Sequence, residues 1–267
     1  MTMVITSLQN KLVKEAAGLK QKKHRDESGL FMAEGVRLCE EVATSDWLLE
    51  TCFFTAEAAE DRRTGLVLNT LSTRGCTLIE VSPAILSKIA ETEEPQGILV
   101  TVRQKKITLD EVLVAAKVPC IVVLDGVRDP GNAGTIIRTA DAAGCTAVVL
   151  LQDCVDLYAG KTVRSTMGSL VHLPVIYSIT TAEFLAVIKK YGLKLAVTAI
   201  DGAKPYYDAS LTEAVAIVFG SESHGVSDEL TAASSDKVYI PMLGKTESLN
   251  VASAAAIILY EAVRQRA

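Results

Sequence analysis

The chain has 267 residues, of which 49% are hydrophobic and 22% are charged, and its net charge is −5. This balance excludes an intrinsically disordered chain and a coiled coil, and the length favours two domains. No apolar run approaches the roughly 18 residues that cross a bilayer. The start of the chain has no signal-peptide pattern, so we expect a cytoplasmic protein without membrane segments.

The first domain is expected over residues 1–102, and it opens with a basic segment. Between positions 11 and 25, six cations stand against the single acid Glu15, which gives a local charge of +5. These cations are Lys11, Lys14, Lys20, Lys22, Lys23 and Arg25. A negative total charge hides such a segment, whose side chains could bind RNA phosphates or could equally form the solvated face of a helix.

Residues 1–28 are predicted to form a basic helix, and the rest of the first domain alternates apolar runs with helices. The apolar runs span 30–33, 47–54, 76–81 and 98–102, the last of which is a predicted strand. One helix is expected from Gly35, and another near Ser82-Pro83, where an N-cap serine precedes a first-turn proline. Residues 103–116 are expected to be a linker.

The second domain is expected over residues 117–267, where strands and helices alternate. The predicted strands span 118–124, 147–151, 170–176, 193–200, 214–219 and 238–240. The first and fifth are continuous apolar runs, which is typical of strands buried on both faces of a parallel sheet. A capping box of Thr180 and Glu183 begins one helix, and Gly192 ends it. We therefore expect an α/β domain with a mostly parallel sheet.

Six cysteines are spread along the chain, and the closest two, Cys145 and Cys154, are nine positions apart. A zinc site or a disulfide framework would need a tighter pattern, such as Cys-x-x-Cys or a Cys/His cluster. We therefore predict isolated reduced thiols and no metal.

Three polar, glycine-rich loops follow predicted strands, at the place where open parallel sheets bind their ligands. The loops span 125–134, 220–225 and 241–250. No Gly-x-Gly-x-x-Gly or Gly-x-Ser-x-Gly sequence occurs, and Val226 instead of lysine follows Gly225. These absences disfavour ordinary NAD enzymes, α/β-hydrolases and P-loop NTPases. Taken singly, the loops could also be plain turns, with Asn132, Ser248 or Asn250 as helix caps.

Segments of these loops resemble, in order, the three signature motifs of the SpoU (TrmH-type) RNA ribose 2′-O-methyltransferases. They are Asn132-Ala133-Gly134-Thr135-Ile136-Ile137-Arg138, Phe219-Gly220-Ser221-Glu222-Ser223-His224-Gly225, and Ile240-Pro241-Met242 with Glu247-Ser248-Leu249-Asn250-Val251-Ala252. Residues 164–169 match another recurrent piece of that family. Residues 31–37 and 95–98 resemble its ribosomal-protein-like substrate-binding domain. The resemblance covers nearly the whole chain.

The resemblance implies a SPOUT-type fold, with a mostly parallel sheet and a C-terminal trefoil knot, after a smaller N-terminal α/β domain. It also implies S-adenosylmethionine as cofactor and a homodimer formed through the C-terminal domain. The adenosine of the cofactor would lie near Gly220, Ile240 and Leu249. A glycine at position 220 suits the close approach of a ligand, although a tight turn explains it equally well.

The same resemblance places Arg138 beside the RNA acceptor, where family accounts make the equivalent arginine a base. Because a guanidinium stays protonated in proteins, we expect Arg138 to bind the adjacent phosphate and stabilise the developing alkoxide. Asn132 would orient the acceptor or Arg138, and Glu222 would position polar groups of the second loop. Ser248 and Asn250 would shape the cofactor pocket and the ribose site. The alternative for each is a solvated residue or a helix cap.

RNA selection is expected from the basic segment together with Arg37, unless Arg37 pairs with Glu34. The favoured substrate is large-subunit ribosomal RNA, and transfer RNA is the close alternative. A non-catalytic RNA-binding factor in ribosome assembly would not need the candidate residues that are present. A small-molecule α/β enzyme would leave the basic segment unexplained.

Overall fold

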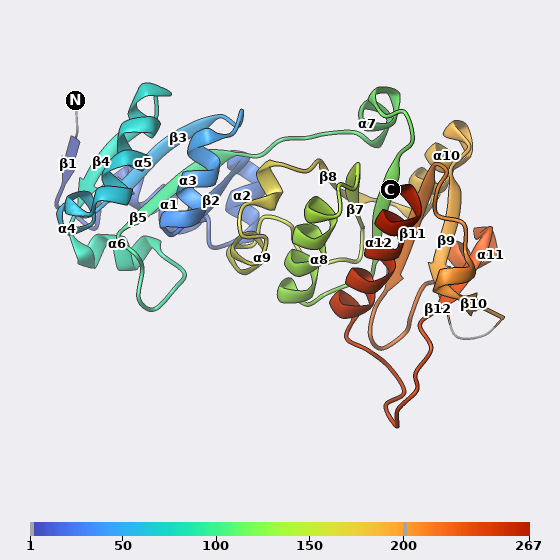
Figure 1. The fold of residues 1–267 in the computed structure, drawn as a ribbon. Helices are drawn as coiled ribbons and strands as arrows, with labels where there is room; N and C mark the ends of the chain where they lie inside the picture. Colours follow the sequence, from blue (N-terminus) through green and yellow to red (C-terminus); the bar gives the residue numbers. More distant parts are fainter. Residues whose placement is uncertain (1–2, 200–201) are drawn as a thin grey trace. The chain divides into compact units, whose positions relative to one another are not determined.

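The computed structural model describes residues 3–199 and 202–267, which form two compact units (Figure 1). One unit comprises the described residues up to Lys105 together with Tyr158–Val171. The other comprises Lys106–Leu157 and the described residues from His172 to Ala267. No helix in the described part of the chain is long and apolar enough to cross a membrane.

The first unit has a five-stranded sheet in the order β1-β4-β3-β5-β2. The strands are β1 (Met3–Ile5), β2 (Leu30–Glu34), β3 (Leu49–Phe54), β4 (Thr77–Val81) and β5 (Ile98–Arg103). Strands β1, β4 and β3 are parallel, whereas β5 runs antiparallel to both β3 and β2. The apolar runs predicted in this region are therefore strands, and β1 is an additional one.

The basic segment forms two helices instead of the single predicted one. The helices of this unit are α1 (Lys11–Gly18), α2 (Lys22–Ser28), α3 (Val36–Thr44), α4 (Ala56–Glu60), α5 (Arg62–Thr73), α6 (Pro83–Ile89) and α9 (Gly160–Ser165). Between α1 and α2 the chain turns so that buried Leu19 packs in the same core as Val13 and Ala16. The prediction of one continuous helix was wrong because burial of Leu19 favours a turn at this point.

Helix α9 comes late in the sequence but packs against β2 of the first unit. Just before it, the ring of Tyr158 lies 4.8 Å from the ring of Phe31, between ring centroids. After it, the 3-10 turn Ser169–Val171 is buried. The predicted strand 170–176 is correct only at its last two residues, because β8 spans Val175–Ile179. An apolar run alone does not distinguish a strand from a buried turn.

The second unit has a seven-stranded sheet in the order β10-β12-β9-β11-β6-β7-β8, and every pair of neighbours is parallel. The strands are β6 (Cys120–Asp125), β7 (Ala147–Leu151), β8 (Val175–Ile179), β9 (Lys194–Thr198), β10 (Lys204–Pro205), β11 (Val215–Gly220) and β12 (Asp236–Tyr239). The expectation of a mostly parallel α/β sheet is confirmed. Ile200, the predicted end of one strand, lies outside the described residues.

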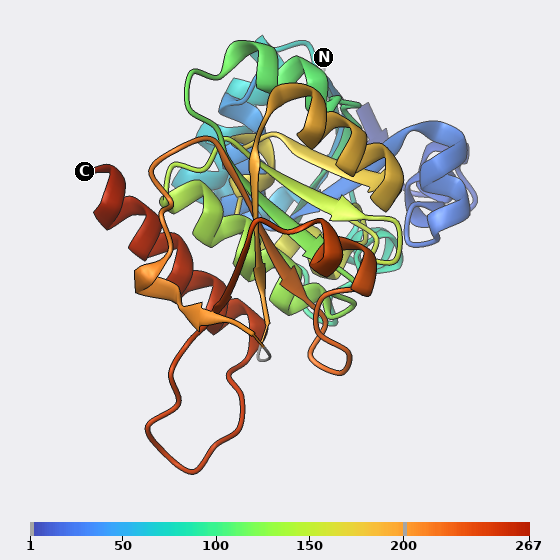
Figure 2. The same cartoon turned by 90° about the vertical axis from the view of Figure 1, so that its right-hand side faces the viewer.

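Helices cover both faces of this sheet, with α8 and α12 side by side on one of them (Figure 2). The helices are α7 (Leu109–Ala115), α8 (Pro130–Ala142), α10 (Thr181–Tyr191), α11 (Asp228–Ala233) and α12 (Val251–Arg266). Helix α10 has the predicted capping box, and Gly192 ends it in the left-handed conformation. The knotted threading of the C-terminal segment stays a prediction from the family resemblance.

The segment expected to be a linker, 103–116, is largely ordered structure. Arg103 ends strand β5, and Leu109–Ala115 forms helix α7. The side chains of Leu109 and Leu113 are buried in the same core as Phe184 of α10. These residues therefore belong to the second unit, because burying them removes apolar surface from water.

Candidate active site

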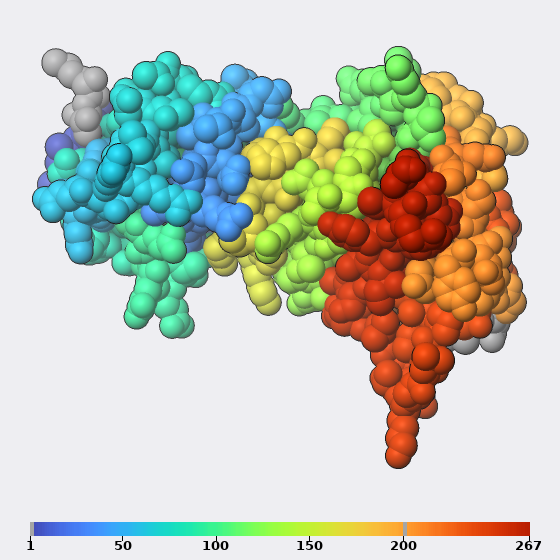
Figure 3. Space-filling model, viewed as in Figure 1, coloured from blue at the N-terminus to red at the C-terminus, as the bar shows by residue number. Residues whose placement is uncertain are grey.

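Strands β6, β11 and β12 are parallel members of one sheet, so their carboxyl ends lie at the same edge. The loops that follow them contain the three predicted motifs. The third loop, residues 240–250, protrudes from the second unit (Figures 2 and 3).

Three predicted site residues from three different loops meet at this edge. Nδ2 of Asn250 donates a hydrogen bond to Oδ1 of Asn132 over 2.9 Å. Nδ2 of Asn132 in turn donates to Oε1 of Glu222. We call these three residues the Asn132 network. Its members are 118 and 90 positions apart in the sequence, so the tertiary structure alone brings them together.

The direction of each amide in the Asn132 network is determined from both ends. The carboxylate of Glu222 accepts hydrogen bonds, so Asn132 presents its NH2 group to Glu222 and its oxygen to Asn250. At the other end, Oδ1 of Asn250 accepts from the backbone N–H groups of Ala252 and Ser253 over 2.9 and 3.4 Å. The NH2 group of Asn250 is therefore left for Asn132.

The N-terminus of α8 is capped by Asp129, whose Oδ1 accepts from the backbone N–H of Asn132 over 2.8 Å. Asn132 is thus inside the first turn, and the interpretation of Asn132 as the N-cap is wrong. Its side chain is free from capping and joins the network instead. Asn250 does cap α12 and also belongs to the network. Both helix N-termini carry partial positive charge, which favours a carboxylate such as that of Glu222.

Gly220 is buried at the end of β11, where the chain turns back on itself. A Cβ atom at this position would lie 2.0 Å from the carbonyl carbon of Gly225. Ser221 and Gly225 exchange backbone hydrogen bonds that close this turn. The turn therefore accounts for the glycine, with or without a ligand.

The third loop is largely exposed and contains no helix or strand. Ile240 is half-buried, Ser248 is exposed, and Leu249 and Leu243 are 37% and 99% exposed. Within the described part of the chain, residues 241–249 form no backbone–backbone hydrogen bond. Backbone groups normally find partners. Free N–H and C=O groups beside apolar side chains fit the adenosine of the expected cofactor, which would bind to the backbone here.

Arg138 lies apart from the Asn132 network. It is six residues after Asn132 on α8, which places it about 9 Å along the axis and about 120° around the helix. Its side chain is exposed and, among the described residues, forms no hydrogen bond or ion pair. The convergence expected for the motifs is thus seen for Asn132, Glu222 and Asn250, while Arg138 points to a different face of the helix.

The basic segment is mostly exposed, but several of its lysines have partners. Nζ of Lys22 lies 2.7 Å from Asp26, whereas Lys11 and Lys23 make looser contacts with glutamates four positions on. Nζ of Lys20 donates to the backbone carbonyl of Lys88. Lys14 is exposed. Exposed i,i+4 pairs are weak, so these lysines stay available to phosphates.

Arg25 differs from the lysines, because only 4% of its surface is exposed and its guanidinium donates to the Leu19 carbonyl over 2.7 Å. Its expected role in RNA binding was therefore wrong: the side chain stabilises the turn between α1 and α2. Arg37 is exposed at the start of α3. The buried carboxylate of Glu34 is bound instead by Arg164 and by the backbone of Glu91 and Thr92, so Glu34 is not the partner of Arg37.

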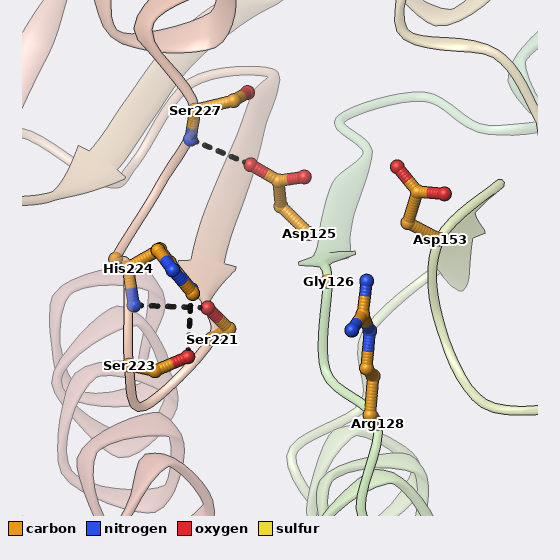
Figure 4. A pocket seen from close by; sticks show the side chains of 9 residues that line it. Asp125, Gly126, Arg128, Asp153, Ser221, Ser223, His224 and Ser227 are labelled. Atoms are coloured by element: carbon orange, nitrogen blue, oxygen red, sulfur yellow. Dashed lines mark hydrogen bonds between the residues drawn. The ribbon is translucent and has the colours of Figure 1, made fainter.

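A cavity of about 210 Å³ lies between the loops that follow β6, β7 and β11 (Figure 4). Its charged lining residues include Asp125, Arg128 and Asp153, and loop residues 221–227 form the opposite wall. None of these three charged residues was among the predicted site residues. Their position directly after predicted strands was the signal that could have found them. Among the described residues, no group of side chains could hold a metal ion.

Comparison with known proteins matches both parts of the chain. Residues 119–260 match the SpoU rRNA methylase family, and residues 10–100 match the MRM3-like substrate binding domain. The chain is 35% identical to the 23S rRNA (guanosine(2553)-2′-O)-methyltransferase RlmP of Bacillus subtilis, over 96% of this chain and 97% of that protein. It is 32% identical to the 23S rRNA (guanosine-2′-O-)-methyltransferase RlmB of Vibrio cholerae, over 80% of this chain and 88% of that protein.

Among solved structures, the chain is similar to an AdoMet-bound rRNA methyltransferase from Sinorhizobium meliloti. The TM-score is 0.88 at 33% identity, and the match covers 98% of each chain.

Proposed function

Since the chain belongs to the SpoU rRNA methylase family, we propose that it transfers a methyl group from S-adenosylmethionine to a ribose 2′-hydroxyl of large-subunit ribosomal RNA. The observation that carries this proposal is the Asn132 network, which joins all three family motifs at one edge of the parallel sheet. A ribosomal substrate follows the relatives, whose names specify 23S rRNA along most of the chain's length.

When bound, S-adenosylmethionine supplies a methyl group on a positively charged sulfur, so the transfer needs only a well-placed oxygen nucleophile. The third loop provides backbone groups without partners in the described chain, together with the apolar side chains of Ile240 and Leu249. The absence of a side chain at Gly220 permits the tight turn of the second loop, which the backbone hydrogen bonds between Ser221 and Gly225 close. These residues bind and orient the donor.

The acceptor oxygen must approach in line with the methyl group and lose its proton during transfer. The Asn132 network offers a carboxylate oxygen on Glu222 and fixed amide groups that orient the ribose. Arg138 lies on another face of α8 than the Asn132 network, but its exposed side chain is long and keeps its charge. It acts from there by binding the phosphate next to the acceptor and stabilising negative charge on the oxygen. Ser248 lies two positions before Asn250 in the third loop, and with it shapes the cofactor pocket and the ribose site.

RNA selection is proposed for the first unit. The exposed cations are Lys11, Lys14, Lys20, Lys22, Lys23 and Arg37. Contacts of lysine and arginine with phosphates give salt-dependent affinity without sequence information. Transfer RNA is the alternative substrate, whereas a non-catalytic binding factor would leave the Asn132 network without a purpose.

We further propose a homodimer formed through the second unit and a cytoplasmic place of action. Support for the dimer comes from α12, which exposes 52% of Tyr260 although the helix is otherwise rich in apolar residues. Light scattering on the purified full chain tests this state, and a monomeric mass at micromolar concentration would contradict it.

The decisive experiment incubates the chain with labelled S-adenosylmethionine and unmodified 23S rRNA or tRNA transcripts, and then maps the modified nucleotide. We expect label on a single ribose of the ribosomal transcript. The Asn132→Ala variant should lose most of the transfer, whereas Lys189→Ala, an exposed change on α10, should not. Label on a base atom, or none at all, would contradict the proposal.

A further inference from the structure

The cavity between the loops after β6, β7 and β11 holds charges that face one another without pairing. Asp125, Arg128 and Asp153 all line it, and in Figure 4 the guanidinium of Arg128 extends toward Gly126 while the carboxylate of Asp125 turns toward the backbone of Ser227. Within the described residues, neither Arg128 nor Asp153 forms a hydrogen bond or an ion pair. Opposite charges that converge on a cavity and yet stay apart suit a ligand that bridges them with both donors and acceptors.

Asp125 is held in place while part of its carboxylate stays open. Its Oδ2 accepts the backbone N–H of Ser227 over 2.7 Å, which ties the end of β6 to the second loop. The other oxygen, Oδ1, is left for a donor in the cavity. The opposite wall contains Ser221, Ser223 and His224, whose Nδ1 lies 2.7 Å from the Ser223 hydroxyl.

The cavity borders the Asn132 network directly. Ser221 and Ser223 line it, and the residue between them is Glu222, so the network and the cavity share one short loop. Neighbouring Cα atoms are about 3.8 Å apart. A nucleotide whose ribose lies at the network can therefore extend its base into the cavity. At about 210 Å³ the cavity is smaller than the roughly 300–1,000 Å³ typical of pockets for whole ligands, which suits a single base.

We propose that this cavity binds the guanine base of the acceptor nucleotide, an inference that rests on the proposed RNA methyl transfer. Guanine presents two adjacent donors. N1–H matches the free oxygen of Asp125, and the 2-amino group matches the carboxylate of Asp153, since ionised carboxylates only accept. It also presents O6 and N7 together, and an arginine binds that pair of acceptors in a bidentate manner. Single-stranded RNA bases are recognised along these same edges. Adenine has a single amino donor on these edges and lacks O6.

The test uses RNA that carries guanosine, inosine or 7-deazaguanosine at the mapped nucleotide. Inosine lacks the 2-amino group, and 7-deazaguanosine lacks N7. A good bidentate contact distinguishes bases by about 1–3 kcal/mol, so kcat/KM should fall about 5- to 160-fold for each analogue.

Substitutions assign each contact to its residue. In Asp153→Ala, kcat/KM for guanosine should drop to the wild-type value for inosine, and inosine itself should be unaffected. In Arg128→Ala, guanosine and 7-deazaguanosine should react with equal kcat/KM, and both should be slower than in the parent chain, because 7-deazaguanosine still presents O6 to the arginine. Glu229→Ala and Lys189→Ala remove exposed charges of the second unit outside the cavity, and they should keep the full wild-type discrimination. A variant that slows all three RNAs equally would contradict base recognition.

A second measurement separates this inference from the proposed function. Saturation-transfer NMR with guanosine and inosine monophosphates tests the cavity without methyl transfer, and the stronger guanosine signal should disappear in Asp153→Ala. If the chain binds guanosine monophosphate but does not methylate RNA, the result would contradict the proposed function and support the guanine site. Binding of the free nucleotide without discrimination between the RNA analogues would instead indicate a site for free nucleotides. A mapped acceptor other than guanosine would overturn the inference outright.

Discussion

Charged side chains serve different ends in the two units. In the first unit, the Glu34 carboxylate is buried and bound by Arg164 and two backbone N–H groups. In the second unit, Arg128 and Asp153 stand exposed at strand ends and have no partner among the described residues. The surroundings of a charged side chain therefore decide whether it stabilises the fold or is available to bind a ligand.

The physical reason is the cost of desolvation. A charge that is removed from water must be paired and hydrogen-bonded within the protein, so it has no capacity left to bind a ligand. An exposed charge in a loop after a strand stays hydrated, and a ligand can replace the water bound to it. Substitutions of the buried charges in the first unit should therefore change stability, and those of the exposed charges at the sheet edge of the second unit should change activity.

The largest effect is expected for Arg138→Ala. Loss of one group that stabilises developing charge slows catalysis by about 10²–10³-fold or more. Because Arg138 is exposed and forms no hydrogen bond or ion pair among the described residues, affinity for S-adenosylmethionine and the unfolding midpoint should stay nearly unchanged. Single-turnover methyl transfer measures the rate, calorimetric titration the cofactor affinity, and urea unfolding the midpoint. A large loss of cofactor affinity would contradict the role on the acceptor side.

The next largest effect is expected for Arg164→Ala, this time on stability. The substitution leaves the buried Glu34 carboxylate with fewer donors, and we expect a loss of about 2 kcal/mol in the free energy of unfolding. Arg63→Ala is the matched control, because its pair with Glu40 is exposed and should contribute less than about 1 kcal/mol. Urea unfolding compares the two, and equal losses would break the contrast between buried and exposed charges.

Buried Arg25 and exposed Lys14 of the basic segment should respond to substitution in opposite ways. Arg25→Met should destabilise the first unit by about 1–2 kcal/mol, since the Leu19 carbonyl loses a buried donor. It should leave the salt dependence of RNA binding unchanged. Lys14→Met should do the reverse, with stability kept and the slope of log K against log salt smaller by about 1. Filter binding at several salt concentrations measures the slope, and a changed slope in Arg25→Met would restore Arg25 to the RNA surface.

The smallest effect on stability is expected at Glu261, a carboxylate of the second unit that is buried and paired like Glu34 of the first. Hydrogen bonds from Arg264 and Gln265 lower the pKa of its carboxyl from 4.5 to about 2. Its contribution is complete above pH 4.5 and is lost as the pH falls toward 2, since protonation favours the unfolded state. Glu261→Gln should cost less than about 1 kcal/mol near pH 6, because Arg264 is mostly exposed.

Urea unfolding at pH 6 and pH 3 tests this dependence. The difference in stability between the parent chain and Glu261→Gln should shrink at the lower pH. A difference that stays constant would show that the ion pair contributes nothing to folding.

Local signals in the sequence predicted most elements of both units. The capping box of Thr180 and Glu183, the N-cap Ser82 and the continuous apolar run of β6 each depend on neighbouring residues, and the structure contains all three. The signals failed where long-range burial decided the outcome. The turn that buries Leu19, the 3-10 turn before β8 and helix α7 in the expected linker are examples.

The candidate site divides in the same way. The motif residues Asn132, Glu222 and Asn250 were identifiable from the resemblance, but nothing in the sequence showed that they form one hydrogen-bonded chain. The true cap of α8, Asp129, was missed because an asparagine three positions later is an equally good cap in isolation.

The sequence by itself determined the α/β class, the parallel sheet and the motif residues, because strand periodicity, helix caps and short motifs are properties of adjacent positions. Only the tertiary structure decided that Arg25 is buried, that Asn132 binds both Glu222 and Asn250, and that Asp125, Arg128 and Asp153 share a cavity. Those facts depend on which distant segments exclude water from a side chain, and that is settled when the sheet assembles.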